Sequence, residues 1–441
     1  MRRWWIWASL AAAVLAAVAG LFWLPPLLRR VEAPIVVGLV HSATGPLGGA
    51  ESAMLEAEIL ALEEINESGG LLGRRLEWRV ADGRSEPREF GREARRLVEE
   101  EKVAAIVGGL TSASREALMG AIGSADVLLI HAGLFEGMEN SMSWFGLGPL
   151  PNQQAMPAVS WCVDALGARK FFLAGVRDVS SYAVHAVVRD QLKALGGEAV
   201  GEGFVGLDGS GAGELAAAMK ASGADVAIST IVGDANAAFL GQFAAAGLTP
   251  EKLPIVCLRV SEDDLRRIPP EHAAGHYAAW AYFQSLGGEA NRRFVERFRA
   301  RHGAERTVGD PAASAYYGVK LWARAVEEAG STRTVELLEH LPRQSVGMRD
   351  EVISVDRDMV HAWRPFRVGK IRRDGQIDEV WSLDRSIRPI AYPIFRPGSE
   401  WRAALEGWRS IGEREAGSPA PPPGEPPTPA RPAAANGPIA R

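Results

Sequence analysis

Ile35-Val36-Val37-Gly38-Leu39-Val40 is followed at once by the small polar loop His41-Ser42-Ala43-Thr44-Gly45 and then by a long amphipathic helix. The apolar run is short, rich in β-branched residues and not alternating with polar ones. Such a run is typical of a parallel strand that is buried on both faces. In open α/β sheets, ligands bind just beyond the carboxyl ends of such strands. The stretch therefore predicts an α/β fold with a ligand site at residues 41–45.

The same alternation of apolar runs and helical segments continues along the chain in two series. The first series predicts strands at 76–81, 103–107 and 127–130 and helices at 87–101 and 112–123. The second predicts strands at 171–174, 199–205, 226–229 and 255–258 and helices near 182–195, 213–221 and 235–246. A Gly/Pro-rich segment at 146–151 separates them, as a crossing between two lobes would. We therefore expect parallel βα units in two lobes.

The late part of the chain changes character. Helices are predicted at 289–301, 311–329 and 332–341, followed by a strand-rich region at 352–381 with a hairpin-type turn at 373–376. We expect these elements to return to the two lobes separately. Lobe 1 would then comprise residues 34–148 and about 281–345, and lobe 2 residues 149–280 and about 346–400.

Composition narrows the class of protein. With 441 residues, 47% of them hydrophobic, the chain exceeds one ordinary domain and buries a large core. Its formal net charge of −5 gives no electrostatic reason to expect a nucleic-acid partner. The two cysteines, Cys162 and Cys257, lie in apolar contexts, which favours free buried thiols and leaves a disulfide open.

The two ends of the chain differ from the rest. No charged residue occurs from Trp4 to Leu28, and about 20 apolar residues suffice to cross a bilayer as a helix. Residues 1–31 therefore predict a single-pass membrane anchor. The alternative is a cleavable signal peptide ending near Ala17-Val18-Ala19, but the apolar run continues beyond that point. At the other end, residues 417–441 are rich in Pro, Ala and Gly and predict a disordered tail.

The sequence contains no Gly-x-x-x-x-Gly-Lys-Ser/Thr loop, no His-Glu-x-x-His and no Gly-x-Ser-x-Gly. His41 and His131 both follow predicted strands and could converge on one crevice. A metal would need a further ligand, and no His/Asp/Glu cluster has suitable spacing. We therefore expect neither a metal nor a cofactor, and interpret both histidines as structural or polar cleft residues.

Small hydroxyl and acidic residues follow several of the predicted strands. Ser112 is placed to cap the next helix, and Thr111 precedes it. A helix N-terminus with free N–H groups also suits a polar ligand, so both roles are compatible. In the second series, Asp178 and Ser180 follow one strand and Asp234 follows another, as a helix cap or a ligand contact. Opposed polar strand ends predict a cleft that closes on a small polar molecule.

Several motifs resemble one known family. They are Glu63-Glu64-Ile65-Asn66 followed by the turn at 69–74, Pro151-Asn152-Gln153-Gln154, the segment 229–236, Asp310-Pro311, and Asp374-Gly375-Gln376. Together they resemble the urea and short-chain amide branch of ABC-transporter solute-binding proteins, over residues 34–395. The resemblance implies the type I periplasmic binding protein fold of the leucine/isoleucine/valine-binding superfamily, with two doubly wound parallel-sheet lobes and a cleft between them.

The resemblance also implies a function and a site. The expected protein is no enzyme: it is anchored in the cell membrane, faces the periplasm or the cell exterior, captures a small urea-, amide- or amino-acid-like solute, and delivers it to an ABC permease. Carried onto this sequence, the expected ligand-binding residues are Ser42, Thr44, Leu110, Thr111, Ser112, His131, Ala132, Gly133, Asp178, Ser180, Gly233 and Asp234.

The expected pocket departs from the pattern of that branch. Ser112, Glu136, Gly137 and Asp234 match it, but most of its tyrosines are missing, and Leu110 stands where the branch has an aromatic residue. A small planar amide is held by aromatic walls and a few fixed hydrogen bonds. Fewer aromatic walls predict a larger pocket and a polar ligand bigger than urea, or a degenerate pocket used for signalling.

Two other classes of function remain open at the level of sequence. The first is a ligand-sensing regulator that docks on a membrane partner such as a kinase, for which an uncleaved anchor would be suitable. The second, more remote, is a hydrolytic enzyme of α/β type.

Overall fold

The computed structural model describes residues 33–139, 144–348 and 351–415. The compact unit analysed below begins at Ile35. The predicted anchor at 1–31 and the predicted tail at 417–441 lie outside the described residues. Across the described ranges, we find no helix that is both long enough and apolar enough to cross a bilayer.

The opening stretch forms the second strand of a five-stranded parallel sheet. Its strands are β1 (Ile35–His41), β2 (Leu76–Asp82), β3 (Ala105–Gly108), β4 (Leu128–His131) and β5 (Trp144–Gly146), in the order β2-β1-β3-β4-β5. Within β1, Val37 and Leu39 enter one apolar cluster and Val40 enters another. The strand is therefore covered on both faces, as its sequence predicts.

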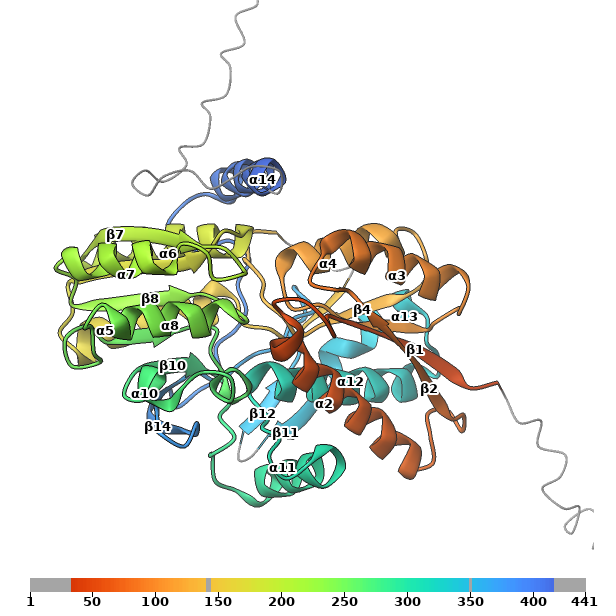
Figure 1. Ribbon diagram of the computed structural model, residues 1–441. Helices are drawn as coiled ribbons and strands as arrows, with labels where there is room; N and C mark the ends of the chain where they lie inside the picture. The colour runs from red at the N-terminus through yellow and green to blue at the C-terminus, as the bar shows by residue number, and fades with distance from the viewer. Residues whose placement is uncertain (1–32, 140–143, 349–350, 416–441) are drawn as a thin grey trace, which may run out of the picture. The chain divides into compact units, whose positions relative to one another are not determined.

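Helices supply that cover. Figure 1 shows α3 (Pro87–Glu99) and α4 (Ser112–Ile122) on one side of the sheet. On the other side, α2 (Gly48–Glu67) packs along α12 (Asp310–Ala329) and contacts α11 (Glu289–His302). We call this sheet and these helices the first lobe.

The second lobe is built on a seven-stranded sheet. Its strands are β6 (Lys170–Val176), β7 (Glu198–Val205), β8 (Val226–Thr230), β9 (Ile255–Cys257), β10 (Tyr277–Trp280), β13 (Arg367–Ile371) and β14 (Ile377–Ser382), in the order β14-β13-β10-β9-β8-β6-β7. Strands β6 to β10 pair in parallel, whereas β13 and β14 add an antiparallel edge. The second sheet therefore combines the expected parallel strands with an antiparallel edge, which comes from the late strand-rich region. The hairpin turn predicted at 373–376 joins the two antiparallel strands, with Gly375 at a φ of +76°.

The second lobe contains six helices among its described residues. They are α5 (Ala155–Ala165), α6 (Val179–Leu195), α7 (Ala212–Ala221), α8 (Ala235–Ala245), α9 (Glu262–Leu265) and α10 (Pro270–Ala273). Of these, α5 precedes the first strand of the lobe and the others follow its strands. After α12 and before β13, the sequence forms α13 (Thr334–His340) and a small hairpin of β11 (Ser345–Met348) and β12 (Glu351–Ser354). Both α13 and β11 contact α12. Short 3-10 helices occur at Pro151–Gln153 and Leu341–Arg343.

Within the residues that the structure describes, the chain passes between the two sheets three times. We call residues 147–154 the first crossing, 281–288 the second and 355–366 the third, because each connects an element of one lobe to an element of the other. In the third crossing, His361 forms a bridge with Gly146 at the end of β5. The crossings therefore lie next to one another.

A last helix, α14 (Gly398–Glu415), was not predicted from the sequence. Trp401 and Leu405 are buried in a cluster with Tyr182 and Val187 of α6. At its other end, Nε of Arg409 donates to Oε1 of Glu116 in α4, 2.9 Å away. The helix thus contacts both lobes. Its apolar residues at 401, 405 and 408 have the spacing that predicts an amphipathic helix.

Candidate ligand site between the lobes

The loop after β1 is held by buried charges of its own lobe. Nδ1 of His41 lies 3.1 Å from Oε2 of Glu51, and Nε2 lies 2.9 Å from Oε1 of Glu58. The hydroxyl of Ser42 donates to Oε1 of Glu51 at 3.0 Å. All four side chains are buried. His41 and Ser42 therefore fasten β1 to α2.

The charge state of His41 follows from these partners. Burial by itself lowers the pKa of the imidazole, but the charge of Glu58 and the hydrogen bonds that the ring donates to Glu51 and Glu58 outweigh it and raise the pKa to about 10. At neutral pH the ring is therefore a cation between two carboxylates. This ion triplet is structural, which agrees with one of the two roles expected for His41.

Thr44, Gly233 and Asp234 lie where the loops of the two lobes touch. Thr44 donates from its hydroxyl to Oδ2 of Asp82 at 2.8 Å. The backbone N–H of Asp234 donates to the carbonyl of Pro46 at 3.0 Å, and a Cβ on Gly233, whose φ is +66°, would lie 2.6 Å from the same oxygen. Direct contact between loops therefore fills this edge of the interface.

The Asp234 side chain does not cap α8, although the residue occupies the N-cap position. Its carboxylate lies 3.3 Å from Nε of Arg267, and it is half exposed. The expected capping bond is therefore absent from Asp234. Its position between loops agrees with an interface role.

Predicted site residues from the first lobe form one packed group around α4. Thr111 is the N-cap of α4 and accepts from the backbone N–H of Ser114 at 3.1 Å. The prediction that Ser112 is the cap is wrong by one residue, because Thr111 has the extended backbone that a cap requires. Ser112 is buried, and its hydroxyl lies 3.5 Å from the carbonyl of Leu134.

The loop after β4 is fixed against this group. The carbonyl of Leu110 accepts from the N–H of Leu134 at 2.7 Å. Ala132 is buried, and a Cβ on Gly133 would lie 2.3 Å from the Leu110 oxygen. Only glycine permits so close an approach of the two loops.

His131 is fully buried, with Nδ1 at 3.0 Å from the carbonyl of Gly108 and Nε2 at 3.2 Å from that of Leu134. Burial, together with the charge of Arg115, lowers its pKa to about 4. His131 is therefore neutral at pH 7. His41 and His131 each have partners of their own, and within the described residues no group of three His, Cys, Asp or Glu side chains is arranged to hold a metal ion.

The buried side chain of Arg115 also holds the loop after β4. Nη2 of Arg115 lies 2.7 Å from Oε1 of Glu139 and 3.5 Å from Oε2 of Glu136. Its guanidinium also lies 4.9 Å from the centre of the Phe135 ring and 5.0 Å from that of Trp144. This cation–π and ion-pair cluster holds the segment 134–139 in place.

A small cavity lies between this loop and the second lobe. Its walls come from both lobes and from the first crossing: Leu134, Phe135, Pro149, Leu150, Pro151, Gln154, Ala155, Ser180, Val184, Thr230, Leu258 and Arg259. Ser180 is the member of the predicted site set that lines it. The other predicted residues stay predictions as ligand contacts.

Arg259 is the residue of this wall that sequence reasoning missed. It follows β9, which ends at Cys257, so the rule that ligands gather at strand ends would have indicated it. The guanidinium is buried, and Nη2 donates to the hydroxyl of Ser180 at 2.6 Å. Nη1 lies 3.5 Å from Oδ2 of Asp178, whose Oδ1 caps α6 by accepting from the N–H of Ser181 at 2.6 Å.

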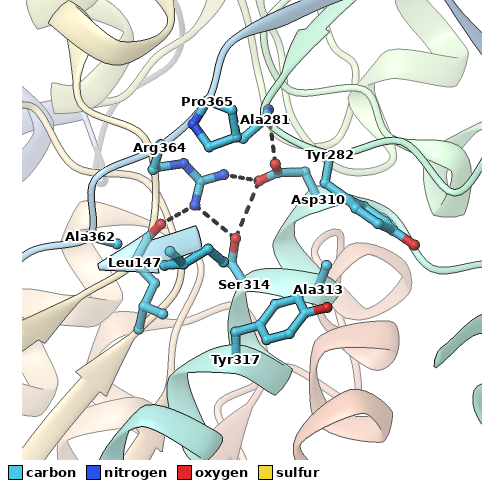
Figure 2. A pocket seen from close by; sticks show the side chains of 11 residues that line it. Leu147, Ala281, Tyr282, Asp310, Ala313, Ser314, Tyr317, Ala362, Arg364 and Pro365 are labelled. Atoms are coloured by element: carbon cyan, nitrogen blue, oxygen red, sulfur yellow. Dashed lines mark hydrogen bonds and ion pairs between the residues drawn. The ribbon is translucent and has the colours of Figure 1, made fainter. Parts of the chain in front are cut away.

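A second hollow lies among the crossings, and Figure 2 shows how charged side chains tie them together. Nη2 of Arg364, in the third crossing, donates to Oδ1 of Asp310 at 2.5 Å, and Nη1 donates to the hydroxyl of Ser314 at 2.8 Å. The same Nη1 donates to the carbonyl of Leu147 in the first crossing. Oδ2 of Asp310 accepts from the N–H of Ala281, in the second crossing, at 3.0 Å.

The side chains of Gln153 and Gln154 also tie the first crossing to its neighbours. Nε2 of Gln153 donates to the carbonyl of Ala362 at 2.9 Å. Nε2 of Gln154 donates to the carbonyls of Leu258 and Ala279, at 2.8 and 2.7 Å. The motif that carried the resemblance therefore joins the first crossing to the third crossing and to the second lobe.

Comparison with known proteins agrees with this architecture. Residues 35–398 match the family described as periplasmic binding protein domain. The solute-binding protein of an ABC transporter from R. palustris, solved in complex with 4-hydroxybenzoate, superimposes with a TM-score of 0.72 at 18% identity, over 81% of this chain and 98% of that one.

Two curated relatives match over shorter stretches. An amino acid binding protein of Pseudomonas aeruginosa is 26% identical over 167 residues, which are 37% of this chain and 45% of that protein. A protein named limonene hydroxylase, from Geobacillus stearothermophilus, is 32% identical over 117 residues, 26% of this chain and 21% of that protein. The chain thus spans less than half the length of either relative. Because the family match covers most of the sequence, the chain belongs to the periplasmic binding protein family and has its type I fold.

Proposed function

We propose that the protein captures a small polar solute between its lobes and delivers it to an ABC-type permease. The observation that carries this proposal is the cavity whose walls combine Leu134 and Phe135 of the first lobe with Ser180, Thr230 and Arg259 of the second. A site assembled from two lobes is complete only when the lobes are together. The R. palustris structure, described as a solute-binding protein with 4-hydroxybenzoate, supports the same use of this fold.

The geometry suits binding without chemistry. The polar residues of the walls are Gln154, Ser180, Thr230 and Arg259, and the remaining ones are apolar. Water leaves the cavity when a solute enters, so each fixed polar group discriminates strongly between solutes. No bond of the solute is broken in this mechanism.

In this proposal, the three crossings form the hinge about which the two lobes rotate. Arg364 and Asp310 bind groups from all three crossings, so the crossings move as one unit while the lobes rotate about them. Closure brings the loop at 44–47 against Gly233 and Asp234. The closed form is then the one that a permease would recognise.

Solute class and location complete the proposal. The resemblance favours a urea-, amide- or amino-acid-like solute, and the amino acid binding protein of Pseudomonas aeruginosa is consistent with the last of these. We place the binding lobes on the periplasmic or outer side of the membrane, attached through the apolar segment 1–31.

Thermal unfolding of the full chain tests the proposal. The panel is urea, formamide, acetamide, the amino acids and hydroxybenzoates. A solute at about 100 times its dissociation constant stabilises the folded state by about 2.7 kcal/mol, which raises the unfolding temperature. Small-angle scattering should show a smaller radius of gyration in the same samples.

A cavity-filling variant serves as the control. Val184→Phe places an aromatic ring in the cavity wall and should abolish the response. Lys193→Phe changes an exposed position of the same helix and should leave it intact. If no solute raises the unfolding temperature or compacts the chain, the proposed function is wrong.

A further inference from the structure

The cavity wall contains a buried cation whose hydrogen bonds are incomplete. Arg259 is 5% exposed, and a guanidinium stays protonated in proteins. Nη2 donates to Ser180, but Nη1 makes no hydrogen bond and is shielded from solvent. Buried polar groups in folded proteins are nearly always paired. The free donor therefore indicates a missing acceptor on the cavity side.

Two acids of the chain lie near Arg259, and neither gives Nη1 a hydrogen bond. Asp178 forms an ion pair with Nη1 at 3.5 Å, and its other oxygen caps α6. Glu136 pairs with Arg115, and burial raises the pKa of this carboxyl group. Neither acid completes the hydrogen bonds of the guanidinium.

Ser180 adds a second donor at the same place. Its oxygen accepts from Arg259 at 2.6 Å, so its own hydroxyl hydrogen points away from the guanidinium and toward another acceptor. Two donors, one of them charged, thus lie side by side on the wall. A carboxylate has two acceptor oxygens and fits such a pair.

The other residues of the cavity wall determine which kind of group, beside the carboxylate, the ligand can have. Leu134, Phe135, Val184 and Leu258 are apolar, and none of the described residues that line the cavity is acidic. An ammonium group would find no carboxylate on the wall, whereas an apolar or aromatic body would find close packing.

We propose that Arg259 and Ser180 form the binding site for the carboxylate of a small monocarboxylate with an apolar or aromatic body. This inference rests on the proposed function and narrows it. A neutral amide would offer the charged Arg259 a single neutral acceptor oxygen and would turn its own N–H group toward donors. The protein therefore prefers an acid over the amide of the same shape.

Matched acid and amide pairs test this on the full chain. Calorimetric titration compares benzoate with benzamide and 4-methylpentanoate with 4-methylpentanamide. Each acid should bind at least about tenfold more tightly than its amide, as expected for hydrogen bonds to a charged partner. Leucine, which adds an ammonium group to 4-methylpentanoate, should bind more weakly than that acid.

Variants of the protein show which residue causes the preference for the acid over the amide. Arg259→Gln should remove the preference for the acid, and Arg259→Lys should keep part of it because it keeps the charge. Arg266→Gln, which removes an exposed positive charge of the same lobe, should leave both affinities unchanged. Circular dichroism and the unfolding temperature without solute show whether each variant is folded.

The outcomes separate the two proposals. An amide or urea that binds the wild type as tightly as the acid, or acid binding that survives in Arg259→Gln, overturns the carboxylate site while the solute-binding function stands. Tighter binding of leucine than of 4-methylpentanoate overturns the choice of a monocarboxylate. A wild type that binds none of these compounds, nor any of the wider panel, overturns both.

Discussion

Nη2 of Arg364 and Oδ1 of Asp310 lie 2.5 Å apart with almost no exposure to solvent, although 54 positions of sequence separate the two residues. Arg364 belongs to the third crossing, and Asp310 begins α12 of the first lobe. Through Ala281 and Leu147, the same pair also holds the other two crossings. One ion pair thus connects the three crossings of the described residues.

Replacing one partner of this pair should destabilise the protein strongly. Removing one member of a buried ion pair leaves an uncompensated charge and costs about 3–5 kcal/mol. We expect that loss for Arg364→Met, and a similar one for Asp310→Asn, measured by urea unfolding. The double variant should cost less than the sum of the single ones, because no charge is then left alone.

An exposed arginine is the matched control for that experiment. Arg372 pairs with Asp374 and Asp378 on the surface, where ion pairs contribute little. Arg372→Met should therefore hardly move the unfolding midpoint. Equal midpoints for Arg364→Met and Arg372→Met would show that the buried pair does not hold the crossings.

His41 should make stability depend on pH in the alkaline range. Its folded pKa of about 10 lies above the ordinary value of 6.5. The stabilisation is therefore complete below about pH 6.5 and is lost as the pH rises through 10. The urea midpoint of the wild type should fall between pH 7 and pH 10.

The variant His41→Gln tests the origin of that slope. It should be less stable at pH 7, because Glu51 and Glu58 lose their cation. Its midpoint should also change less from pH 7 to pH 10 than that of the wild type. Parallel pH profiles for the two proteins would contradict the assignment.

The docking of α14 should depend on Trp401. This side chain is fully buried, and its Nε1 donates to the carbonyl of Pro393 at 2.7 Å. The helix begins at residue 398, where the family match ends. Trp401→Ala should cost about 3–5 kcal/mol, the usual loss for a buried tryptophan, in urea unfolding.

Trp381, which is 36% exposed on β14, provides the comparison. Trp381→Ala should be clearly milder than Trp401→Ala. Hydrogen exchange should also show faster exchange in α14 of the Trp401 variant. An unchanged exchange rate would mean that the tryptophan does not fasten the helix.

The two cysteines should be inert to thiol reagents in the folded protein. Both are free and buried. Burial raises the pKa of Cys257 to about 12 and that of Cys162 above its ordinary range, so little reactive thiolate forms. Ellman's reagent should label neither thiol in the native state and both in urea. Rapid labelling of the native protein would contradict the burial.

Much of the fold was predictable because its signals are local. The strands from β1 to β9, except β5, lie where the sequence predicted them. Among these, the inner strands are largely buried and show continuous hydrophobic stretches, whereas β2 and β7 are edge strands with partly exposed residues. β5 and β10, three and four residues long, were not predicted, although β3, β4 and β9 are equally short and were. The helix α14 has a clear apolar spacing that was overlooked.

The site was less predictable because it depends on which strand ends face each other. Ser42 and Asp178 follow strands as expected, but their polar groups bind Glu51 and Ser181 within their own lobes. Arg259 also follows a strand, yet its role depends on meeting Ser180, 79 positions earlier in the sequence. No local pattern encodes such a pairing.

The amide of Gln154 links the choice of solute to the motion of the protein. Its two hydrogens bind the carbonyls of Leu258 and Ala279, so Arg259 follows directly after a residue that the first crossing holds. A substitution at position 259 that changes the preferred solute would therefore also affect the rotation of the lobes. A substitution of Ser180, on α6, would change the preferred solute with less effect on that rotation.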